Sequence, residues 1–222
     1  MEKLKNIALN ILGSLSNLLV KEDTRLERLL RIEPEKMYLL LPKSRRYIEK
    51  DCFAMFDYTN GVIKTIIKSI KFKNNLAMKE RFALYLYDEI LSLVSDVELF
   101  SGSKPLITAV PMSKDEKKER GFNQCEEILS VVKRLSSDNL DIRFDILEKT
   151  RDTARQVKLS REERLKNIRN SIQVKKEKVE NIKDRVVVVF DDVYTTGATF
   201  GEARRALGAA GARQVYGLFL AH

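Results

Sequence analysis

Residue types that build many catalytic and metal sites are scarce in this 222-residue chain, which has one histidine, two cysteines and no tryptophan. Because the histidine is also the last residue, the sequence argues against an imidazole base, a serine–histidine triad and a histidine metal site. Cys52 and Cys125 are far apart and form no CxxC pair, so with His222 they cannot supply the four ligands of a structural zinc ion. Any reaction must rely on carboxylates, lysines, hydroxyls, backbone donors or a bound metal ion.

Long uninterrupted hydrophobic runs are also missing, and this bears on the first twenty residues. Their apolar side chains recur at helical spacing, while asparagine and serine residues occupy the other side. The interruption is too frequent for a membrane span, and no small-residue cleavage site follows, so a signal peptide is not expected. We expect an amphipathic helix that packs against its own domain or a partner. The two cysteines, interpreted as reduced and buried, indicate a cytoplasmic protein. The apolar stripe consists of Leu4, Ile7, Ala8, Ile11, Leu12, Leu15, Leu18 and Leu19.

The length of the chain limits its domain organisation. With 44% hydrophobic residues, it can bury the core of one medium domain and carry a small appendage. We place the domain at residues 52–222 and the appendage at residues 1–51, which would comprise the amphipathic helix and a charged stretch. Within that stretch, Leu39 to Leu41 precede a proline and are compatible with a short strand.

The most informative stretch is 186–199, with the sequence VVVVFDDVYTTGAT. Its first five residues are a continuous β-branched and aromatic run, which is typical of a parallel strand covered on both faces. Asp191 and Asp192 would then leave the carboxyl end of a central strand, the edge where ligands collect in open α/β sheets. The following turn feeds a helix predicted at residues 200–207, so backbone N–H groups, hydroxyls and the helix dipole could hold a phosphate there. The turn consists of Thr195, Thr196, Gly197, Ala198 and Thr199.

The two carboxylates cannot also be phosphate ligands, because anion would face anion. They must serve hydroxyl donors or a cation, and ribose hydroxyls and hydrated magnesium are the natural candidates. The simpler alternative is that Asp191 and Asp192 only cap the helix and solvate the strand end. A nucleoside triphosphatase is disfavoured, because the chain has no glycine-rich loop ending in Gly-Lys-Ser or Gly-Lys-Thr. The pattern predicts a sugar-phosphate site.

The rest of the chain predicts strands that alternate with helices. Ser160 and Glu163 form a capping box for a short helix, and residues 175–184 are a charged connector that we expect to be an exposed turn or loop. The alternation predicts an α/β fold with a mostly parallel twisted sheet and helices on both faces. We expect helices at residues 61–70, 77–94, 123–135 and 200–207, and strands at residues 106–110, 144–147, 171–174, 186–190 and 215–220.

The stretch VVVVFDDVYTTGAT resembles the phosphoribosyl pyrophosphate (PRPP) motif of the type I phosphoribosyltransferases. Further segments resemble the competence protein ComF family in the same order, and the resemblance covers roughly residues 52–222, which is more specific than one short motif. Members of that family commonly begin with a cysteine-rich zinc module that two cysteines cannot form, and residues 21–50 could be a remnant of it. The matching segments are residues 53–58, 70–73, 110–124 with the string RGFNQ, and 149–167.

The resemblance implies a type I phosphoribosyltransferase-like fold and a role for each part of the site. Asp191 and Asp192 would hold the ribose hydroxyls of PRPP, with Mg²⁺ as cofactor, and residues 195–199 would hold the 5-phosphate. Phosphoribosyl transfer tolerates the lack of histidine, because positioning, charge neutralisation and magnesium can carry the reaction. An ordinary solvated loop is the alternative for the basic segment. The implied pyrophosphate loop consists of Met112, Ser113, Lys114 and Arg120, with Lys117 and Lys118 adding positive charge.

The resemblance also implies a role in DNA uptake during natural transformation, with single-stranded DNA and a helicase-like protein as partners. The net charge of +9, from 41 basic and 32 acidic residues, favours polyanionic partners but is also common on soluble surfaces. A second basic group recurs along one predicted helix and could follow a nucleic-acid backbone, with Phe72 or Tyr58 for base stacking. A solvated helix face is the alternative. This group consists of Lys64, Lys68, Lys71 and Lys73.

Three functions therefore stay open. The first is a phosphoribosyltransferase of nucleotide salvage or synthesis, which transfers a ribose 5-phosphate unit from PRPP to an unidentified acceptor. The second is a PRPP-binding competence protein that assists DNA uptake, and the third is a regulator that senses PRPP without turnover. The fold does not decide between them, and no acceptor-binding segment is recognisable in the sequence.

Overall fold

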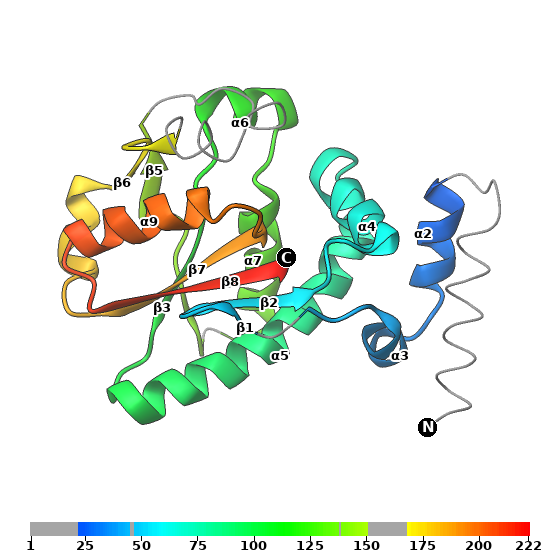
Figure 1. Cartoon of the computed structure of the whole chain (residues 1–222), viewed down its shortest axis with the longest axis horizontal. Helices are drawn as coiled ribbons and strands as arrows, with labels where there is room; N and C mark the ends of the chain where they lie inside the picture. The colour runs from blue at the N-terminus through cyan, green and yellow to red at the C-terminus, as the bar shows by residue number, and fades with distance from the viewer. Residues whose placement is uncertain (1–21, 45–46, 138, 151–167) are drawn as a thin grey trace.

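The computed structural model describes residues 22–44, 47–137, 139–150 and 168–222 (Figure 1). It has a six-stranded sheet in the order β1–β2–β8–β7–β3–β4. β1 is antiparallel to β2, and every other neighbouring pair is parallel. The expected α/β class with a mostly parallel sheet is therefore confirmed. The strands are β1 (Tyr47–Glu49), β2 (Cys52–Phe56), β3 (Leu106–Ala109), β4 (Asp141–Ile142), β7 (Val186–Val193) and β8 (Gln214–Ala221).

The centre of the sheet is β7, the strand with the strongest signal in the sequence. Val186 to Phe190 are all buried, with β3 on one side and β8 on the other. Burying one such side chain contributes about 1.5–3 kcal/mol, so this strand anchors the core. The strand continues to Val193, beyond the predicted end at Phe190, because its ladder with β8 runs past the acidic pair. Its ladder with β3 stops at Phe190, so the acidic pair projects beyond β3.

Helices cover both faces of the sheet (Figure 1). α9 (Ala198–Ala209) lies on one face, where its Phe200 packs against a phenylalanine of β8. α5 (Leu76–Ser101) and α7 (Gln124–Leu135) lie on the other, and α4 (Gly61–Phe72) follows β2 and leads into α5. The four helices predicted in the described residues are therefore present, although α5 is longer at its C-terminal end than expected.

Asparagine side chains begin three of these helices. The side-chain oxygens of Asn60, Asn75 and Asn123 accept hydrogen bonds from backbone N–H groups in the first turns of α4, α5 and α7. Such a cap satisfies a donor that otherwise lacks a partner and contributes about 1 kcal/mol. Asn123 also donates from Nδ2 to the carbonyl of Val110 at 3.0 Å. The start of α7 is thereby fixed to the end of β3, which places Gln124 beside the end of β7.

Residues 39–41 do not form the expected short strand. They lie in and directly after α3 (Pro34–Leu40), a helix that begins at Pro34 and buries Met37 completely. Proline already has the backbone angle of a first helical turn, which favours a helix here. α2 (Glu22–Leu30) precedes it and also contributes leucines to the core.

The segment before β7 differs most from the prediction. Residues 144–146 are not in a strand, and β5 (Leu147–Lys149) pairs antiparallel with β6 (Ile172–Val174) in a separate two-stranded sheet. The connector after β6 is not a simple exposed loop, since it contains a 3₁₀-helix at Lys176–Asn181 and buries Ile182 completely. One buried apolar side chain thus fixes a segment whose local sequence is mostly charged.

Two predictions fall outside the described residues: the amphipathic helix in residues 1–20 and the capping-box helix at Ser160 and Glu163. Among the helices that the structure does describe, none is both long and apolar enough to cross a membrane. The longest, α5, carries basic side chains near its start and acidic side chains along its length.

Candidate functional site

The carboxyl end of β7 brings the acidic pair together with side chains from α4 and α7. Asp192 is 4% exposed, and Asp191 is half-buried. Successive residues of a strand normally point to opposite faces, but Oδ1 of Asp191 accepts a hydrogen bond from the backbone N–H of Asp192 at 2.8 Å. The Asp191 side chain therefore lies against the backbone amide of the following residue, and the two carboxyl groups interact with each other. They have to be considered as one unit.

Oδ2 of Asp192 receives two donors. Nζ of Lys71, in the last turn of α4, lies 3.0 Å away, and Nε2 of Gln124, in the first turn of α7, donates at 2.9 Å. Burial by itself raises the pKa of Asp192, but the ion pair with Lys71 and the hydrogen bonds outweigh burial and hold this pKa below its usual value. Asp192 is therefore the charged member of the pair.

Asp191 responds in the opposite direction. Burial, and then repulsion by the Asp192 carboxylate, raise the pKa of Asp191 well above its usual value, although Lys71 opposes the shift. Its Oδ1 also lies 3.8 Å from the thiol of Cys125, which is a weak donor. Near neutral pH the pair therefore holds one shared proton and carries about one negative charge rather than two.

The predicted phosphate loop, residues 195–199, forms the entry to α9. Gly197 is the N-cap residue, in the left-handed conformation with φ +73°, and the helix has no side-chain cap. The amide of Ala198 makes only a long contact, 3.4 Å, with Oγ1 of Thr196. The hollow between this loop and Asp191 has a volume of about 10 Å³. That is room for about one water molecule, so a phosphate could bind only at its mouth.

Tyr194 packs against the inner side of the phosphate loop. Its hydroxyl donates to Oε1 of Glu49 at 2.7 Å, and its ring meets the ring of Phe219 edge-on, with centroids 4.9 Å apart. A Cβ atom at Gly197 would collide with the Tyr194 hydroxyl, so the loop needs glycine for space as well as for its backbone angle. The imidazole of His222 lies beside the same tyrosine ring, 5.5 Å between centroids. The single histidine thus lies at the sheet edge that carries the acidic pair, which the sequence did not indicate.

The predicted pyrophosphate loop is largely a short helix, α6 (Lys114–Arg120). Ser113 and Glu116 form a capping box: the Ser113 hydroxyl accepts from the Glu116 amide at 3.2 Å, and the Ser113 amide donates to the Glu116 carboxylate at 3.0 Å. Ser113 therefore uses its polar groups within the protein rather than offering them to a ligand. The Ser-x-x-Glu pattern is the sequence signal that would have predicted this helix.

A buried lysine anchors α6. Nζ of Lys149 in β5 lies 3.1 Å from Oε2 of Glu116, and the Lys149 side chain is only 8% exposed. Burial by itself raises the pKa of Glu116, but the Ser113 amide and Lys149 outweigh burial and lower this pKa below its usual value. Met112 is half-buried just before the helix. The basic side chains that remain exposed on α6 are Lys114, Lys117 and Lys118.

Arg120, at the end of α6, is the predicted pyrophosphate residue whose contacts reach the acidic pair. Its Nη1 donates to Oε1 of Gln124 at 3.3 Å, and the same glutamine donates to Asp192. The guanidinium carbon also lies 5.3 Å from the ring centroid of Phe72, a side chain that is 66% exposed. The ends of α4, α6 and β7 therefore meet at one place.

The members of the second basic group do not all point to solvent. Lys64, Lys68 and Lys73 are exposed, whereas Lys71 turns to Asp192. Lys71 follows the buried Ile67 by one helical turn and so lies at the edge of the buried stripe of α4. Gln124 belongs to the RGFNQ string, but no sequence pattern predicted its contact with the carboxylates.

Both cysteines are buried and free, as expected. Burial raises the pKa of Cys125 well above its usual value, and burial with the neighbouring Glu49 raises the pKa of Cys52 to about 12. Both side chains are therefore neutral thiols, which cannot act as nucleophiles near neutral pH.

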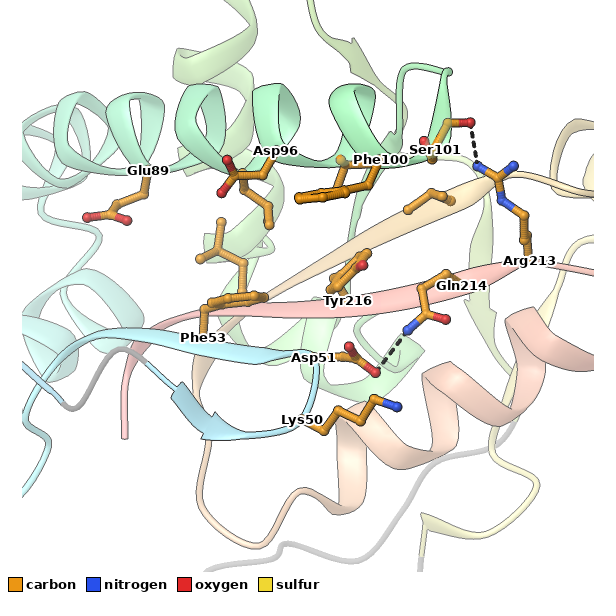
Figure 2. Close-up of a pocket in the computed structure, with 14 residues that line it drawn as sticks. Lys50, Asp51, Phe53, Glu89, Asp96, Phe100, Ser101, Arg213, Gln214 and Tyr216 are labelled. Atoms are coloured by element: carbon orange, nitrogen blue, oxygen red, sulfur yellow. Dashed lines mark hydrogen bonds between the residues drawn. The ribbon is translucent and has the colours of Figure 1, made fainter.

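A larger hollow lies away from the acidic pair. It has a volume of about 700 Å³ and lies between α5 and the amino-terminal parts of β2 and β8 (Figure 2). Phe53 and Tyr216 line it from the sheet and Phe100 from α5, while Gln214 donates to Asp51 at 2.9 Å. Neither carboxylate of the acidic pair lines it. We locate the candidate site by its perturbed carboxylates rather than by the size of a hollow.

Comparison with known proteins supports a relationship with the ComF family. No family model matches the chain. The competence protein ComFC of Streptococcus pneumoniae is 28% identical to it over 167 residues, which cover 73% of this chain and 64% of that protein. The match thus spans less than two thirds of the length of this relative.

Proposed function

We propose that this chain is a PRPP-binding, phosphoribosyltransferase-like protein that takes part in competence, the uptake of DNA during natural transformation. The observation that carries the proposal is the acidic pair at the end of β7, followed closely by a glycine turn at the N-terminus of α9. The similarity to a protein named for competence supports the second half of the proposal.

In this proposal, each part of PRPP meets groups of matching chemistry at one end of the sheet. Asp192 accepts hydrogen bonds from ribose hydroxyls, and protonated Asp191 can both donate and accept. The 5-phosphate binds at the mouth of the phosphate loop, where first-turn amides and threonine hydroxyls can donate to it. The diphosphate extends toward α6, whose Arg120 is oriented by Gln124.

Transfer to an acceptor is the enzymatic form of this proposal. Breaking the bond between ribose C1 and the diphosphate leaves positive charge on the sugar and negative charge on the leaving group. Arg120 and the lysines of α6 would neutralise the leaving diphosphate, while Asp192 would keep a negative charge near the sugar. The acceptor then forms the new bond to C1. PRPP sensing without transfer is the regulatory form, and release of diphosphate distinguishes the two.

The acidic pair does not fit a directly bound magnesium ion. Within the part of the chain that the structure describes, no group of three or more His, Cys, Asp and Glu side chains could hold a metal ion. Oδ2 of Asp192 is already engaged by Lys71 and Gln124. Mg²⁺ keeps several water ligands and commonly binds through substrate phosphate oxygens. We therefore propose that magnesium arrives on the diphosphate of PRPP.

Calorimetric titration with PRPP and magnesium tests the proposal. Wild-type protein should bind with saturable heat, and the double variant Asp191→Asn, Asp192→Asn should bind at least about tenfold more weakly, because it loses the charged acceptor for the ribose hydroxyls. Asp96→Asn is a matched control, since Asp96 is an exposed carboxylate of α5 that lines the distant hollow. Equal heats from wild type and the double variant would reject the ribose assignment.

A second, compatible function is binding of single-stranded DNA beside the same site. The exposed Phe72 ends α4, and Lys64, Lys68 and Lys73 are exposed on or next to this helix. Base stacking on an aromatic ring together with lysine contacts to the backbone is the usual mode of binding single strands. A helicase-like partner acting on the same strand belongs to this proposal.

Fluorescence anisotropy with a labelled single strand across a salt series tests this second function. Phe72→Ala should weaken binding, by about 1–3 kcal/mol for each base that stacks on the ring. Leu76→Ala is the control, because Leu76 is a nearby apolar side chain of similar exposure, 64%, that cannot stack in this way. Equal affinity of the two variants, or no binding at low salt, would refute this function.

A further inference from the structure

We propose that Lys71 is the built-in cation of the acidic pair, so that ribose phosphate binds at Asp192 without a protein-bound divalent metal. This inference rests on the proposed function, because it concerns how the same site handles its own charge. It assigns a role to a lysine whose spacing in the sequence suggested a nucleic-acid contact.

The geometry of Asp192 carries the inference. Nζ of Lys71 lies 3.0 Å from Oδ2, and the exposed fractions of the two side chains are 28% and 6%. Nε2 of Gln124 donates to the same oxygen at 2.9 Å. A metal ion bound to this oxygen would have to displace both donors and would then stand beside an ammonium group. Like charges at such a distance in a poorly solvated place repel strongly.

The charges around the pair balance without a metal. The groups that contact it are Lys71 from α4 and the neutral Gln124 and Cys125 from α7, and Arg120 from the end of α6 contacts Gln124. The phosphate loop contributes only hydroxyls and amides. The pair, which carries about one negative charge, is neutralised by Lys71, and Arg120 lies one contact further away, so the site is neutral to positive before any ligand binds. A divalent ion would add charge that the site does not need, whereas an anionic sugar phosphate is favoured.

The position of Lys71 is fixed by the fold. It lies in the last turn of α4, where the helix dipole favours a cation, and α4 is held to the core by four buried isoleucines. Burial disfavours the ammonium form, but the two aspartates outweigh burial, so the pKa of Lys71 lies above its usual value and the group stays charged. The cation is thus part of the scaffold, and binding of a ligand does not have to recruit it.

Ribose 5-phosphate is the probe of choice for the test, because it lacks the diphosphate that chelates magnesium. Calorimetry should give wild-type protein the same dissociation constant with Mg²⁺ and with EDTA. Lys71→Met should bind about ten- to hundredfold more weakly in EDTA, because the negative charge of the pair then lacks its cation and repels the anionic ligand, and this variant should regain part of the lost affinity in Mg²⁺. Lys71→Arg should stay independent of metal. Lys176→Met is the control, since Lys176 is an exposed lysine of the 3₁₀-helix that precedes β7 and has no assigned role. Wild-type binding that vanishes in EDTA would overturn the inference.

A ligand-free measurement separates this inference from the proposed function. Mn²⁺ titration followed by electron paramagnetic resonance should show no tight site in wild type and in Lys71→Arg, and a new site in Lys71→Met. Equal Mn²⁺ binding by wild type and Lys71→Met would overturn the inference, whether or not ribose phosphate binds. If ribose 5-phosphate binds in neither buffer while Mn²⁺ still distinguishes the variants, the proposed function fails but the role of Lys71 as the cation of the pair stands. Circular dichroism of each variant confirms that it is folded.

Discussion

The hydroxyl of Tyr194 donates a hydrogen bond to Oε1 of Glu49 at 2.7 Å, which ties the start of the phosphate loop to the outermost strand of the sheet. The contact holds the tyrosine ring directly under Gly197. The loop therefore has a rigid floor, and its shape depends on a residue without a side chain at the point of closest approach.

Gly197→Ala should destabilise the protein and weaken anion binding. The backbone of Gly197 has φ +73°, and a Cβ atom would collide with the Tyr194 hydroxyl. We expect a loss of about 1–3 kcal/mol in the free energy of unfolding, measured by urea denaturation, from strain and displacement of the ring. Gly201→Ala in α9 is the control, because a Cβ there meets nothing within 4 Å. That change should leave stability equal or raise it by about 0.5–1 kcal/mol. Identical behaviour of both variants would contradict a rigid loop floor.

The pH dependence of stability should change in Asp191→Asn. The pKa of Asp191 is raised in the folded protein by burial and by Asp192, whereas an unfolded aspartate has a pKa near about 3.9. Between these values the folded protein keeps a proton that the unfolded chain has lost, so this group makes stability fall as pH rises from about 4 toward neutrality. Urea denaturation across this range should show a smaller decline for the variant.

Asp192→Asn should act on the acid side instead. The pKa of Asp192 is lowered in the folded protein, because Lys71 and the hydrogen bonds outweigh burial. Its contribution to stability is present above the unfolded pKa of about 3.9 and is lost as pH falls through the lowered folded value. The same denaturation series, extended to lower pH, should therefore show a shallower acid loss in this variant. Parallel pH profiles for wild type and both variants would mean that the pair does not share a proton.

The two partners of an ion pair in which only the lysine is buried should respond unequally to mutation. Lys79 in α5 is 2% exposed and contacts Glu127 of α7, whose side chain is 37% exposed, and its ammonium lies 3.9 Å from the ring centroid of Phe122. Glu127→Leu leaves a buried charge with fewer partners, which we expect to cost about 3–5 kcal/mol in the free energy of unfolding. Lys79→Met leaves a carboxylate that water can reach, so about 1–2 kcal/mol is expected. Thermal or urea denaturation of both variants measures these losses in the free energy of unfolding. A larger loss for Lys79→Met than for Glu127→Leu would contradict this account.

Neither cysteine should react quickly with a thiol reagent in the folded protein. Burial, the main cause, raises the pKa of Cys52 to about 12 and that of Cys125 well above its usual value, so almost no thiolate is present near neutral pH. Titration with a chromogenic disulfide should show slow reaction in buffer and rapid reaction of both thiols in denaturant. Rapid reaction of one thiol in the native protein would show that its surroundings open.

The sequence was sufficient for the fold class and for the position of the acidic pair at the end of a central strand, and the reason is physical. A run of buried valines has few alternatives to a central parallel strand, and the residues directly after such a strand must lie at the sheet edge. The contacts of Lys71 were not predictable in the same way. Its spacing from Lys64 and Lys68 suggested one solvated face, while the packing of α4 against the sheet turned its end toward Asp192. The helix at residues 114–120 was missed for another reason: the charges of this segment were interpreted as a loop, although Ser113 and Glu116 form a capping box.

The strand order also determines when the carboxyl end of the sheet, which carries the acidic pair and the phosphate loop, can form. β8 lies between β2 and β7, so β2, from the early part of the chain, has no parallel neighbour until β8 is in place. Bringing together segments so distant in sequence costs chain entropy before their contacts contribute stabilising energy. Proteins with many such contacts therefore fold slowly. A nascent or truncated chain without β8 would present two open strand edges, the kind of surface on which chains aggregate. Assembly of the carboxyl end of the sheet should therefore be a late step in folding.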